Sequence, residues 1–452
     1  MFQKILIANR GEIAVRVIRA CREMGILSVA VYSEADRDAL HTQLADEAIC
    51  IGKASPADSY LNMERILSAA IAAKAQAIHP GFGFLSENEH FAKMCETCGV
   101  AFIGPSHQVI GKMGNKSQAR ATMIEAGVPV VPGTKEPVYD AEKGLEIADS
   151  MGYPVMVKAS SGGGGKGMRI APSREEFEGC FHLAQQESVN AFGDNTMYIE
   201  KYIENPRHIE IQILADKYGN VVWLGERDCS IQRNHQKMLE ESPCCAISQS
   251  LRERMGQTAV QAAKAADYEN AGTIEFLLDK DNHFYFMEMN TRIQVEHPVT
   301  EMVTGIDLVK EQIRIAAGEP LHILQEDVAL KGHAIECRIN AEDPSRKFMP
   351  CPGTVNDLHF PGGNGVRIES ALYNGYTIPV FYDSMVAKVI VHGEDREDAI
   401  RKMRSALGEV VVDGVTTNLD FQYDILSHPV FLSGDINTHF IPDYFEVGNG
   451  SK

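Results

Sequence analysis

The sequence has 452 residues, of which 44% are hydrophobic and 23% charged, as in ordinary soluble globular proteins. Its formal net charge of −19 opposes binding to nucleic acid or to an anionic membrane over most of the surface. No apolar run is long enough for a membrane-spanning helix, and the N-terminal apolar stretch is too short for a signal peptide. We therefore expect a cytoplasmic protein of two to four packed units, whose ten scattered cysteines are free reduced thiols.

The first part of the chain, about 110 residues, alternates strand and helix patterns. A buried strand at 4–9 is followed by a helix at 11–24, a strand at 28–32, a helix near 60–74 and a strand at 76–79. This alternation predicts a doubly wound α/β domain. Asn9-Arg10-Gly11-Glu12 follows the first strand in place of the G-x-G-x-x-G fingerprint, which argues against an NAD-dependent enzyme.

Residues 128–139 hold three prolines and one glycine and are typical of a linker. A second unit then runs to about residue 203, with strands at 154–158 and 168–170. A larger unit at 204–330 is rich in strand patterns and has two helical stretches, and residues 331–446 return to alternating strand patterns.

A glycine-rich loop lies between the two strands of the second unit. It has four consecutive glycines followed by Lys166-Gly167, and it is not a Walker A loop because Gly167 stands where Ser or Thr is required. Such a loop predicts a hairpin whose backbone N–H groups approach phosphates, with Lys158 on the incoming strand holding the α- and β-phosphates. The alternative is a mobile glycine linker.

Two segments with alternating polar and apolar residues, 272–279 and 283–290, predict a β-hairpin. If its turn centres on Asp281-Asn282, Glu275 lies directly opposite Glu288, with Cβ atoms about 5 Å apart. A slip of one residue in this register would move one of the two carboxylates to the other face.

Two unpaired carboxylates facing each other repel, so a divalent cation between them is the economical interpretation. Oxygen ligands suit Mg²⁺ or Mn²⁺, and Asn290 falls on the same face as Glu288. The alternative is a pair of solvated strand carboxylates.

Asn290, Arg292, Gln294 and Glu296 follow at a spacing of two, so in an extended chain all four project to one face. A guanidinium matches a planar anion bidentately, and Glu296 is a candidate general base. The alternative is a solvated edge strand. The donor-rich stretch 227–237 suits a loop that lines an anionic site, although taken alone it is more typical of a polar surface loop.

At these residues the sequence resembles the biotin carboxylases of the ATP-grasp superfamily. The resemblance covers nearly the whole chain, and the stretches 288–301 and 333–343 are its most specific parts. Phe82 stands where many members have Tyr. The matching stretches are KILIANRGEIAVR (4–16), HPGFGFLSEN (79–88), KASSGGGGKGM (158–168), EKYIENPRHIEIQ (200–212), ERDCSIQRNHQK (226–237), EMNTRIQVEHPVTE (288–301) and HAIECRINAED (333–343).

The resemblance implies a mixed α/β and α+β architecture of three domains. These are an N-terminal doubly wound (pre-ATP-grasp) domain at 1–112, an ATP-grasp domain at 113–330 with a glycine-rich lid at about 131–203, and a C-terminal biotin carboxylase domain at 331–446. It also implies a reaction. ATP phosphorylates bicarbonate to carboxyphosphate, which breaks down to CO2 and phosphate, and the phosphate deprotonates the biotin ring nitrogen that attacks CO2.

Site residues follow from the resemblance by matching position. Catalysis is expected from Arg292, Glu296, Arg338 and Lys237, with Arg338 stabilising the biotin enolate. Bicarbonate would be bound by Lys237, Arg292, Gln294 and the Val295 backbone, and two Mg²⁺ or Mn²⁺ ions by Glu275, Glu288 and Asn290. ATP would be held by Lys116, Lys158, Gly164, Gly165, Glu200, Lys201, Ile203, His208, Gln232, His235, Glu275 and Glu288.

The sequence contains no Met-Lys-Met biotinylation site and ends soon after the catalytic unit. We therefore expect biotin to arrive on a separate carboxyl carrier protein, with carboxyltransferase subunits completing an acetyl-CoA carboxylase for fatty acid synthesis; the resemblance also implies a homodimer. The alternatives are a subunit of a pyruvate or other acyl-CoA carboxylase, an ATP-grasp carboxylate–amine ligase, and an ATP-binding regulator without catalysis.

Overall fold

The structure is a computed structural model that describes residues 1–134, 136–159 and 167–446. The chain forms two compact units. The first contains residues 1–128, 207–276 and 288 onward, and the second contains residues 129–206 and 277–287. Among the described residues, no helix has both the length and the apolar character needed to cross a membrane.

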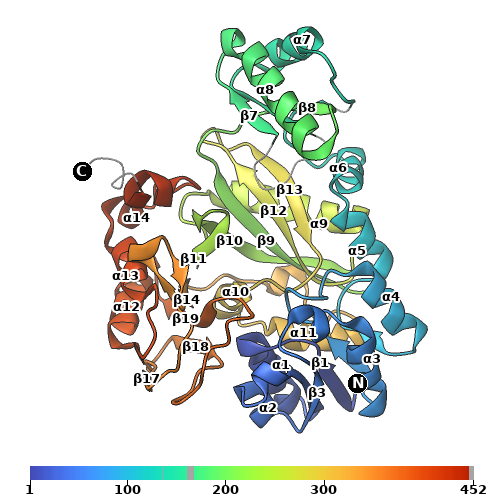
Figure 1. The fold of residues 1–452 in the computed structure, drawn as a ribbon, viewed down its shortest axis with the longest axis vertical. Coiled ribbons are helices and arrows are strands. Elements are labelled where there is room, and N and C mark those ends of the chain that lie inside the picture. Colours follow the sequence, from blue (N-terminus) through green and yellow to red (C-terminus); the bar gives the residue numbers. More distant parts are fainter. Residues whose placement is uncertain (135, 160–166, 447–452) are drawn as a thin grey trace. The chain divides into compact units, whose positions relative to one another are not determined.

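The first unit begins with a five-stranded parallel sheet in the order β3-β2-β1-β4-β5. Ile5 and Ile7 of β1 pack in a cluster with α1, whereas Leu6 packs in a second cluster with α3 and α4. Helices thus cover both faces, which confirms the predicted doubly wound domain (Figure 1). The elements are β1 (Lys4–Ile7), α1 (Gly11–Glu23), β2 (Leu27–Ser33), α2 (Leu40–Leu44), β3 (Glu47–Gly52), α3 (Met63–Ala72), β4 (Ala77–His79), α4 (Glu89–Thr97), β5 (Ala101–Phe102), α5 (His107–Gly114) and α6 (Lys116–Glu125).

An eight-stranded sheet in the order β13-β12-β9-β10-β11-β14-β19-β18 carries most of the candidate site. Its central pairs are antiparallel, and buried polar residues lie on several of its strands. The strands are β9 (Arg207–Ala215), β10 (Val221–Arg233), β11 (Gln236–Ser242), β12 (Asn270–Leu278), β13 (Phe284–Asn290), β14 (His333–Asn340), β18 (Val366–Ser370) and β19 (Met385–Gly393). Associated helices are α9 (Gln249–Ala265), α10 (His297–Thr304) and α11 (Leu308–Ala316).

The C-terminal part contains helices that the strand-only interpretation of residues 331–446 missed. They are α12 (Arg396–Glu409), α13 (Leu419–Ser427) and α14 (Pro429–Ser433). The Asp395 side chain caps α12, and Ile400, Met403 and Leu407 of that helix pack into the core against β14 and β19. Two small antiparallel sheets complete this part: β15 (Glu342–Asp343) with β16 (Met349–Pro350), and β17 (Asp357–His359) with β20 (Val411–Asp413).

The second unit has its own three-stranded antiparallel sheet in the order β7-β6-β8. Phe177 and Phe181 are fully buried and lie 6.0 Å apart between ring centroids. They share one apolar cluster with the sheet, so this unit has a separate core. Its elements are α7 (Ala141–Met151), β6 (Val155–Ala159), β7 (Met168–Ala171), α8 (Arg174–Phe192) and β8 (Met197–Lys201).

The turn of the β12–β13 hairpin differs from the prediction by one residue. The N–H of Asp279 donates to the carbonyl of His283 at 2.9 Å, which leaves a three-residue loop, 280–282. Asn282 adopts a left-handed conformation with φ 63°, and the Asp279 side chain accepts from the N–H of His283 at 2.8 Å. The predicted pairing at the turn is therefore wrong, because an extra residue enters the loop.

Two other local predictions are also corrected. β13 ends at Asn290 and α10 begins at His297, so the predicted extended row from Asn290 to Glu296 is wrong. Glu296 has φ −83° and ψ 12°, which is not extended backbone. The stretch 227–237 is no continuous surface loop either, because all of it except the exposed turn at 234–235 lies on the paired strands β10 and β11.

Candidate active site

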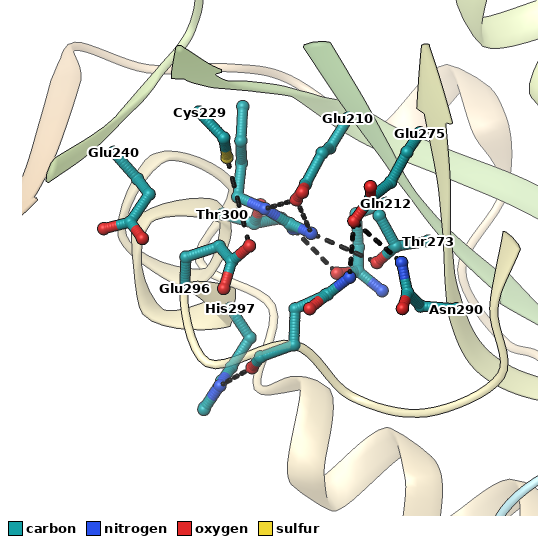
Figure 2. A network of polar contacts seen from close by, with 12 residues as sticks. Glu210, Gln212, Cys229, Glu240, Thr273, Glu275, Asn290, Glu296, His297 and Thr300 are labelled. Atoms are coloured by element: carbon teal, nitrogen blue, oxygen red, sulfur yellow. Dashed lines mark hydrogen bonds and ion pairs between the residues drawn. The ribbon is translucent and has the colours of Figure 1, made fainter. Parts of the chain in front are cut away.

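A fully buried guanidinium lies under the site. Arg227 on β10 donates to Glu210 on β9 at 3.1 Å and to the Gln212 side chain at 2.8 Å. It also donates to the hydroxyls of Thr300 at 3.0 Å and Thr273 at 3.1 Å. Figure 2 shows Glu210, Gln212, Thr273 and Thr300 converging on this point. A buried charge this well paired fixes the positions of its partners.

The Lys237 ammonium on β11 lies among three carboxylates. Its Nζ contacts Glu210, and it is 2.7 Å from Glu296 and 3.1 Å from Glu275. Burial alone would lower the pKa of Lys237, but Glu210, Glu296 and Glu275 raise it well above its ordinary value. Lys237 is therefore charged, and its ammonium offsets part of the negative charge of these three carboxylates.

His208 on β9 contacts one candidate metal ligand, Glu275, and one residue expected to bind ATP, Gln232. Its Nε2 lies 3.0 Å from Glu275, and its Nδ1 contacts the Gln232 amide at 2.7 Å. Burial alone would lower the pKa of His208, yet Glu275, followed by Glu210, raises it to about 9. Burial alone would raise the pKa of Glu275, but Lys237 and His208 lower it well below its usual value. Glu275 is therefore ionised at neutral pH.

The candidate metal ligands surround Glu275. The Asn290 amide donates to Glu275 Oε1 at 2.7 Å, and the Gln294 amide donates to the same oxygen at 3.1 Å. Burial, followed by the charge of Glu275, raises the pKa of Glu288. A divalent cation would remove that penalty, and a set of two carboxylates and one amide oxygen fits Mg²⁺ or Mn²⁺.

Arg292 is oriented by groups on two segments. Its Nε donates to Glu87 at 2.8 Å, and its Nη1 donates to the Gln294 side chain at 2.9 Å. Glu87 also accepts from the N–H of Thr291 at 3.0 Å, which ties the chain just before Arg292. The Arg292 side chain keeps 19% exposure, so its guanidinium is fixed yet accessible to an anion.

Glu296 is fully buried and lies between two cations, Lys237 at 2.7 Å and Arg338 at 2.8 Å. Burial alone would raise the pKa of Glu296, but Lys237 and Arg338 lower it. Arg338 on β14 also donates to Glu240 at 2.6 Å. In Figure 2, Glu296 points toward Cys229, whose Sγ is 3.9 Å away. The lowered pKa keeps Glu296 ionised at neutral pH, so this water-excluded carboxylate is available to accept a proton from an anion held by the two fixed cations.

The remaining candidates come from other elements of the chain. Lys116 begins α6 and is exposed, and His235 is exposed at the β10–β11 turn with φ 63°. In the second unit, Lys158 lies 2.6 Å from Glu200, and Lys201 donates to the carbonyl of Gly152 at 2.9 Å. Ile203 is partly buried in the same unit. Gly164 and Gly165 lie outside the described residues.

Three family models match the chain in succession: biotin carboxylase N-terminal domain at 1–110, carbamoyl-phosphate synthase L chain ATP-binding domain at 115–324, and biotin carboxylase C-terminal domain at 336–443. Biotin carboxylase 1 of Bacillus subtilis is 57% identical over 99% of this chain and 100% of its own length. The chain belongs to the biotin carboxylase family. It is therefore an ATP-dependent ligase with the three-domain mixed α/β architecture of that family.

Relatives that serve different carboxylases are about equally similar. A pyruvate carboxylase subunit of Methanothermobacter thermautotrophicus is 55% identical, covering 98% of this chain and 90% of its own. The biotin carboxylase domain dimer of Hydrogenobacter thermophilus 2-oxoglutarate carboxylase was solved with MgADP and bicarbonate. It has a TM-score of 0.90 and 51% identity and covers 100% of both chains.

The family's site is supported by residues that the sequence reasoning did not single out. Glu210, Arg227, Glu240 and Glu87 hold the expected residues in place through the contacts described above. One signal was available: His208, Glu210 and Gln212 alternate with isoleucines at 209, 211 and 213, which puts three polar side chains on one face of a buried strand. The other residues give no such local signal.

Proposed function

We propose that this chain carboxylates biotin held on a separate carboxyl carrier protein, using ATP and bicarbonate, as the first half-reaction of acetyl-CoA carboxylase. The observation that carries the proposal is the buried Glu296 carboxylate between Lys237 and Arg338, with Arg292 and Gln294 in the same hydrogen-bonded group. That arrangement supplies a proton acceptor and fixed cations for a small anion.

Bicarbonate would lie against Lys237, Arg292, Gln294 and the backbone of Val295. Glu296 would take the proton of bicarbonate while a bicarbonate oxygen attacks the γ-phosphorus of ATP. This step releases ADP and forms carboxyphosphate. Carboxyphosphate then breaks down to CO2 and phosphate inside the site. The cations stabilise the charge that builds up on the transferring group, so positioning and electrostatics supply most of the acceleration.

ATP binding is assigned to the residues named at the end of this paragraph, and the three domains to 1–112, 113–330 (lid about 131–203) and 331–446. The MgADP and bicarbonate with which the Hydrogenobacter relative was solved support the same ligands here. Mg²⁺ or Mn²⁺ bound by Glu275, Glu288 and Asn290 would neutralise charge on the phosphates. The ATP residues are Lys116, Lys158, Gly164, Gly165, Glu200, Lys201, Ile203, His208, Gln232, His235, Glu275 and Glu288.

Biotin would approach Arg338, which is placed to stabilise the enolate of its ureido ring. The phosphate released from carboxyphosphate would remove the N–H proton of the ring, and the nitrogen would attack CO2. The Arg338 side chain is 15% exposed, so a ring can reach its guanidinium. The partners are a biotin carboxyl carrier protein and carboxyltransferase subunits, and a homodimer is supported by the dimeric relative.

The second candidate is that this chain serves a pyruvate carboxylase, because the Methanothermobacter pyruvate carboxylase subunit is 55% identical. The residues assigned to catalysis act before the carboxyl group reaches acetyl-CoA or pyruvate, so they do not distinguish the two carboxylases. A reconstituted reaction with each carboxyltransferase does. Carboxybiotinylated carrier produced by this enzyme would be offered to the acetyl-CoA and the pyruvate carboxyltransferases of the same cell. Formation of malonyl-CoA supports the proposal, and formation of oxaloacetate alone supports the alternative.

The first test of the chemistry measures ADP release with ATP, Mg²⁺ and bicarbonate, with and without free biotin. We expect release to require bicarbonate and to rise with biotin. Stimulation by an amine or another carboxylate in place of biotin would instead indicate a carboxylate–amine ligase. Lack of bicarbonate dependence, even with a biotinylated carrier present, would contradict the proposal.

A further inference from the structure

A buried lysine outside the assigned site ties three segments of the first unit together. Lys388 lies on β19 and is fully buried. Its Nζ donates to the carbonyl of Val295 at 2.7 Å and lies 3.1 Å from the Glu12 carboxylate on α1. The ring centroid of Phe82 lies 5.9 Å from the same ammonium. One charged group thus joins the C-terminal strand, the first helix and the segment that precedes α10.

The ammonium is kept charged by acidic neighbours. Lys388 pairs across the sheet with Arg338 on β14 and with Glu369 on β18. Burial alone would lower the pKa of Lys388, but Glu12, followed by Glu336 and Glu369, raises it. A buried ammonium is costly unless it is well paired, and an apolar side chain would fill the same volume at no such cost. A lysine at this position therefore indicates a specific task for its N–H groups.

The carbonyl that Lys388 binds belongs to a segment without regular structure. β13 ends at Asn290 and α10 begins at His297, so Gln294 and Val295 lie between the two elements, and Glu296 is the N-cap residue of α10. The carbonyl of Gln294 contacts His297 Nδ1 at 2.9 Å, and the carbonyl of Val295 is held by Lys388. Figure 2 shows His297 and Glu296 on this segment. These two side-chain contacts hold the segment together with the first backbone hydrogen bonds of α10, from the N–H of His297 to Gln294 and from the N–H of Val299 to Glu296.

We propose that Lys388 is a positioning residue for bicarbonate: by holding the Val295 carbonyl it sets the Val295 N–H and the Gln294 and Glu296 side chains for the anion. This inference rests on the proposed function, which assigns bicarbonate to this segment. Lys388 does not touch the substrate itself. Its contribution is geometric, and a displacement of about 1 Å in such a segment changes rates by orders of magnitude.

The Asn9-Arg10-Gly11-Glu12 sequence belongs to none of the assigned sites, but two of its residues contribute to the position of Lys388. Glu12 is buried and orients the Lys388 ammonium from α1. The Asn9 amide donates to the carbonyls of Pro80 and Phe82, both at 2.7 Å, and so fixes the loop whose Phe82 ring faces Lys388. The start of α1 and the loop at Phe82 thereby lie against the Lys388 ammonium that holds the Val295 carbonyl.

The alternative is that Lys388 only neutralises Glu12 and contributes to folding. Lys388→Met and the double variant Glu12→Gln/Lys388→Met separate the two roles. The single variant leaves a buried carboxylate unpaired, whereas the double variant restores neutrality, and apolar replacement of a buried pair is commonly tolerated. Both lose the bond to Val295. A purely structural role predicts that the double variant regains wild-type kinetics.

Lys402→Met is the matched control. Lys402 on α12 donates to a backbone carbonyl at the same distance, 2.7 Å to His392 at the end of β19. Its ion pair is with Asp398, which belongs to none of the assigned sites. KM for bicarbonate and KM for ATP would be measured for each variant from bicarbonate-dependent ADP release. Far-ultraviolet circular dichroism would verify folding.

We expect KM for bicarbonate to rise on the order of 10- to 100-fold in both Lys388 variants, with KM for ATP within about twofold. The Lys402 variant should match the wild type. An unchanged KM for bicarbonate in the double variant, equal losses for both substrates, or failure of both variants to fold would overturn the inference. A wild-type enzyme without bicarbonate dependence would instead contradict the proposed function, so the two failures are distinguishable.

Discussion

At the residue scale, Arg338 combines a fixed position with access to a ligand. Glu240 and Glu296 hold its guanidinium at 2.6 and 2.8 Å, and both carboxylates are fully buried. The side chain nevertheless keeps 15% exposure. Two carboxylates on one guanidinium fix its orientation before substrate arrives, so little reorganisation is needed when charge develops on the bound ring.

Arg338→Ala is therefore expected to leave MgATP binding within a few-fold of the wild type and to lower biotin carboxylation by at least about 100-fold. The reason is that, in the described part of the chain, Arg338 forms ion pairs with Glu240 and Glu296, neither of which is assigned to ATP, whereas the proposed function places its guanidinium at the developing enolate. Carboxylation of free biotin and MgATP affinity would be measured in parallel. Unchanged carboxylation would refute the role.

Arg396→Ala provides the control for this substitution. Arg396 binds Glu241, the neighbour of Glu240 on β11, at 2.7 Å, so its removal also breaks a buried arginine–glutamate pair of the same strand. The Arg396 variant should lose stability without losing carboxylation of the folded fraction. Equal losses of carboxylation in the two variants would indicate that Arg338 acts only through packing.

At the element scale, the β12–β13 hairpin shows why local sequence patterns located the two strands but not the turn that sets their register. Alternation placed polar side chains on one face, and Asn290 does contact Glu275 at 2.7 Å. The turn, however, depends on the left-handed conformation of Asn282 and on the Asp279 side chain, which adds one residue to the loop. Periodicity carries no information about such a loop.

Glu288→Gln tests the metal assignment of this hairpin. We expect the Mg²⁺ concentration for half-maximal ADP release to rise about tenfold, because an amide binds a hard cation more weakly than a carboxylate does. The measurement is a Mg²⁺ titration at saturating ATP and bicarbonate. Asp281→Asn, at the exposed turn of the same hairpin, is the control and should leave the titration unchanged. An unaltered Mg²⁺ requirement in the Glu288 variant would count against the site.

The N-terminal sheet should lose stability in acid because of a buried histidine. His41 on α2 is fully buried, with Nε2 3.2 Å from the carbonyl of Val31. Burial lowers the pKa of His41 to about 4. His41 takes up a proton near pH 6.5 in the unfolded chain but only near pH 4 in the folded chain. The free energy of unfolding therefore falls as the pH drops from about 6.5 to about 4.

His41→Gln should remove this part of the pH dependence, since an amide can still donate to Val31 but does not titrate. Of the wild-type loss of stability between pH 7.5 and pH 5, about 2 kcal/mol should be absent in the variant. Unfolding curves at both pH values provide the measurement. His392→Gln is the control, because His392 also contacts a backbone carbonyl, that of Lys331, at 2.8 Å but is only partly buried. Equal pH dependence of the His41 variant and the wild type would contradict this account.

At the scale of the whole molecule, the parts that the sequence predicted are those whose signal is local. The N-terminal α/β sheet follows from strand and helix periods, and Lys237, Glu275 and Glu296 were identified through their motifs. Arg227 and Glu240 were not, because their partners lie far along the chain: Thr300 is 73 residues from Arg227, and Arg338 is 98 residues from Glu240. Such pairs form only through tertiary packing, of strand on strand for Glu240 and Arg338 and of helix α10 on the sheet for Thr300 and Arg227, which composition and period do not specify.

The two compact units have separate apolar cores. A cavity made in one core is therefore expected to destabilise that unit and not the other. Phe177 packs with Phe181, Val155 and Ile199 in the second unit, whereas Phe91 packs in the N-terminal sheet of the first. Both side chains are fully buried, and replacing either by alanine should cost about 3 kcal/mol or more through lost burial and a residual cavity.

Phe177→Ala should accordingly raise amide hydrogen exchange of β6, β8 and α8 by about a hundredfold while β1 and β4 keep their wild-type protection. Phe91→Ala, the matched variant of the first unit, should do the reverse. Exchange followed by mass spectrometry on the full-length protein resolves both sets of strands in one experiment. Equal loss of protection in both units from either substitution would mean that the two units unfold together, which would contradict the separate stability of their cores.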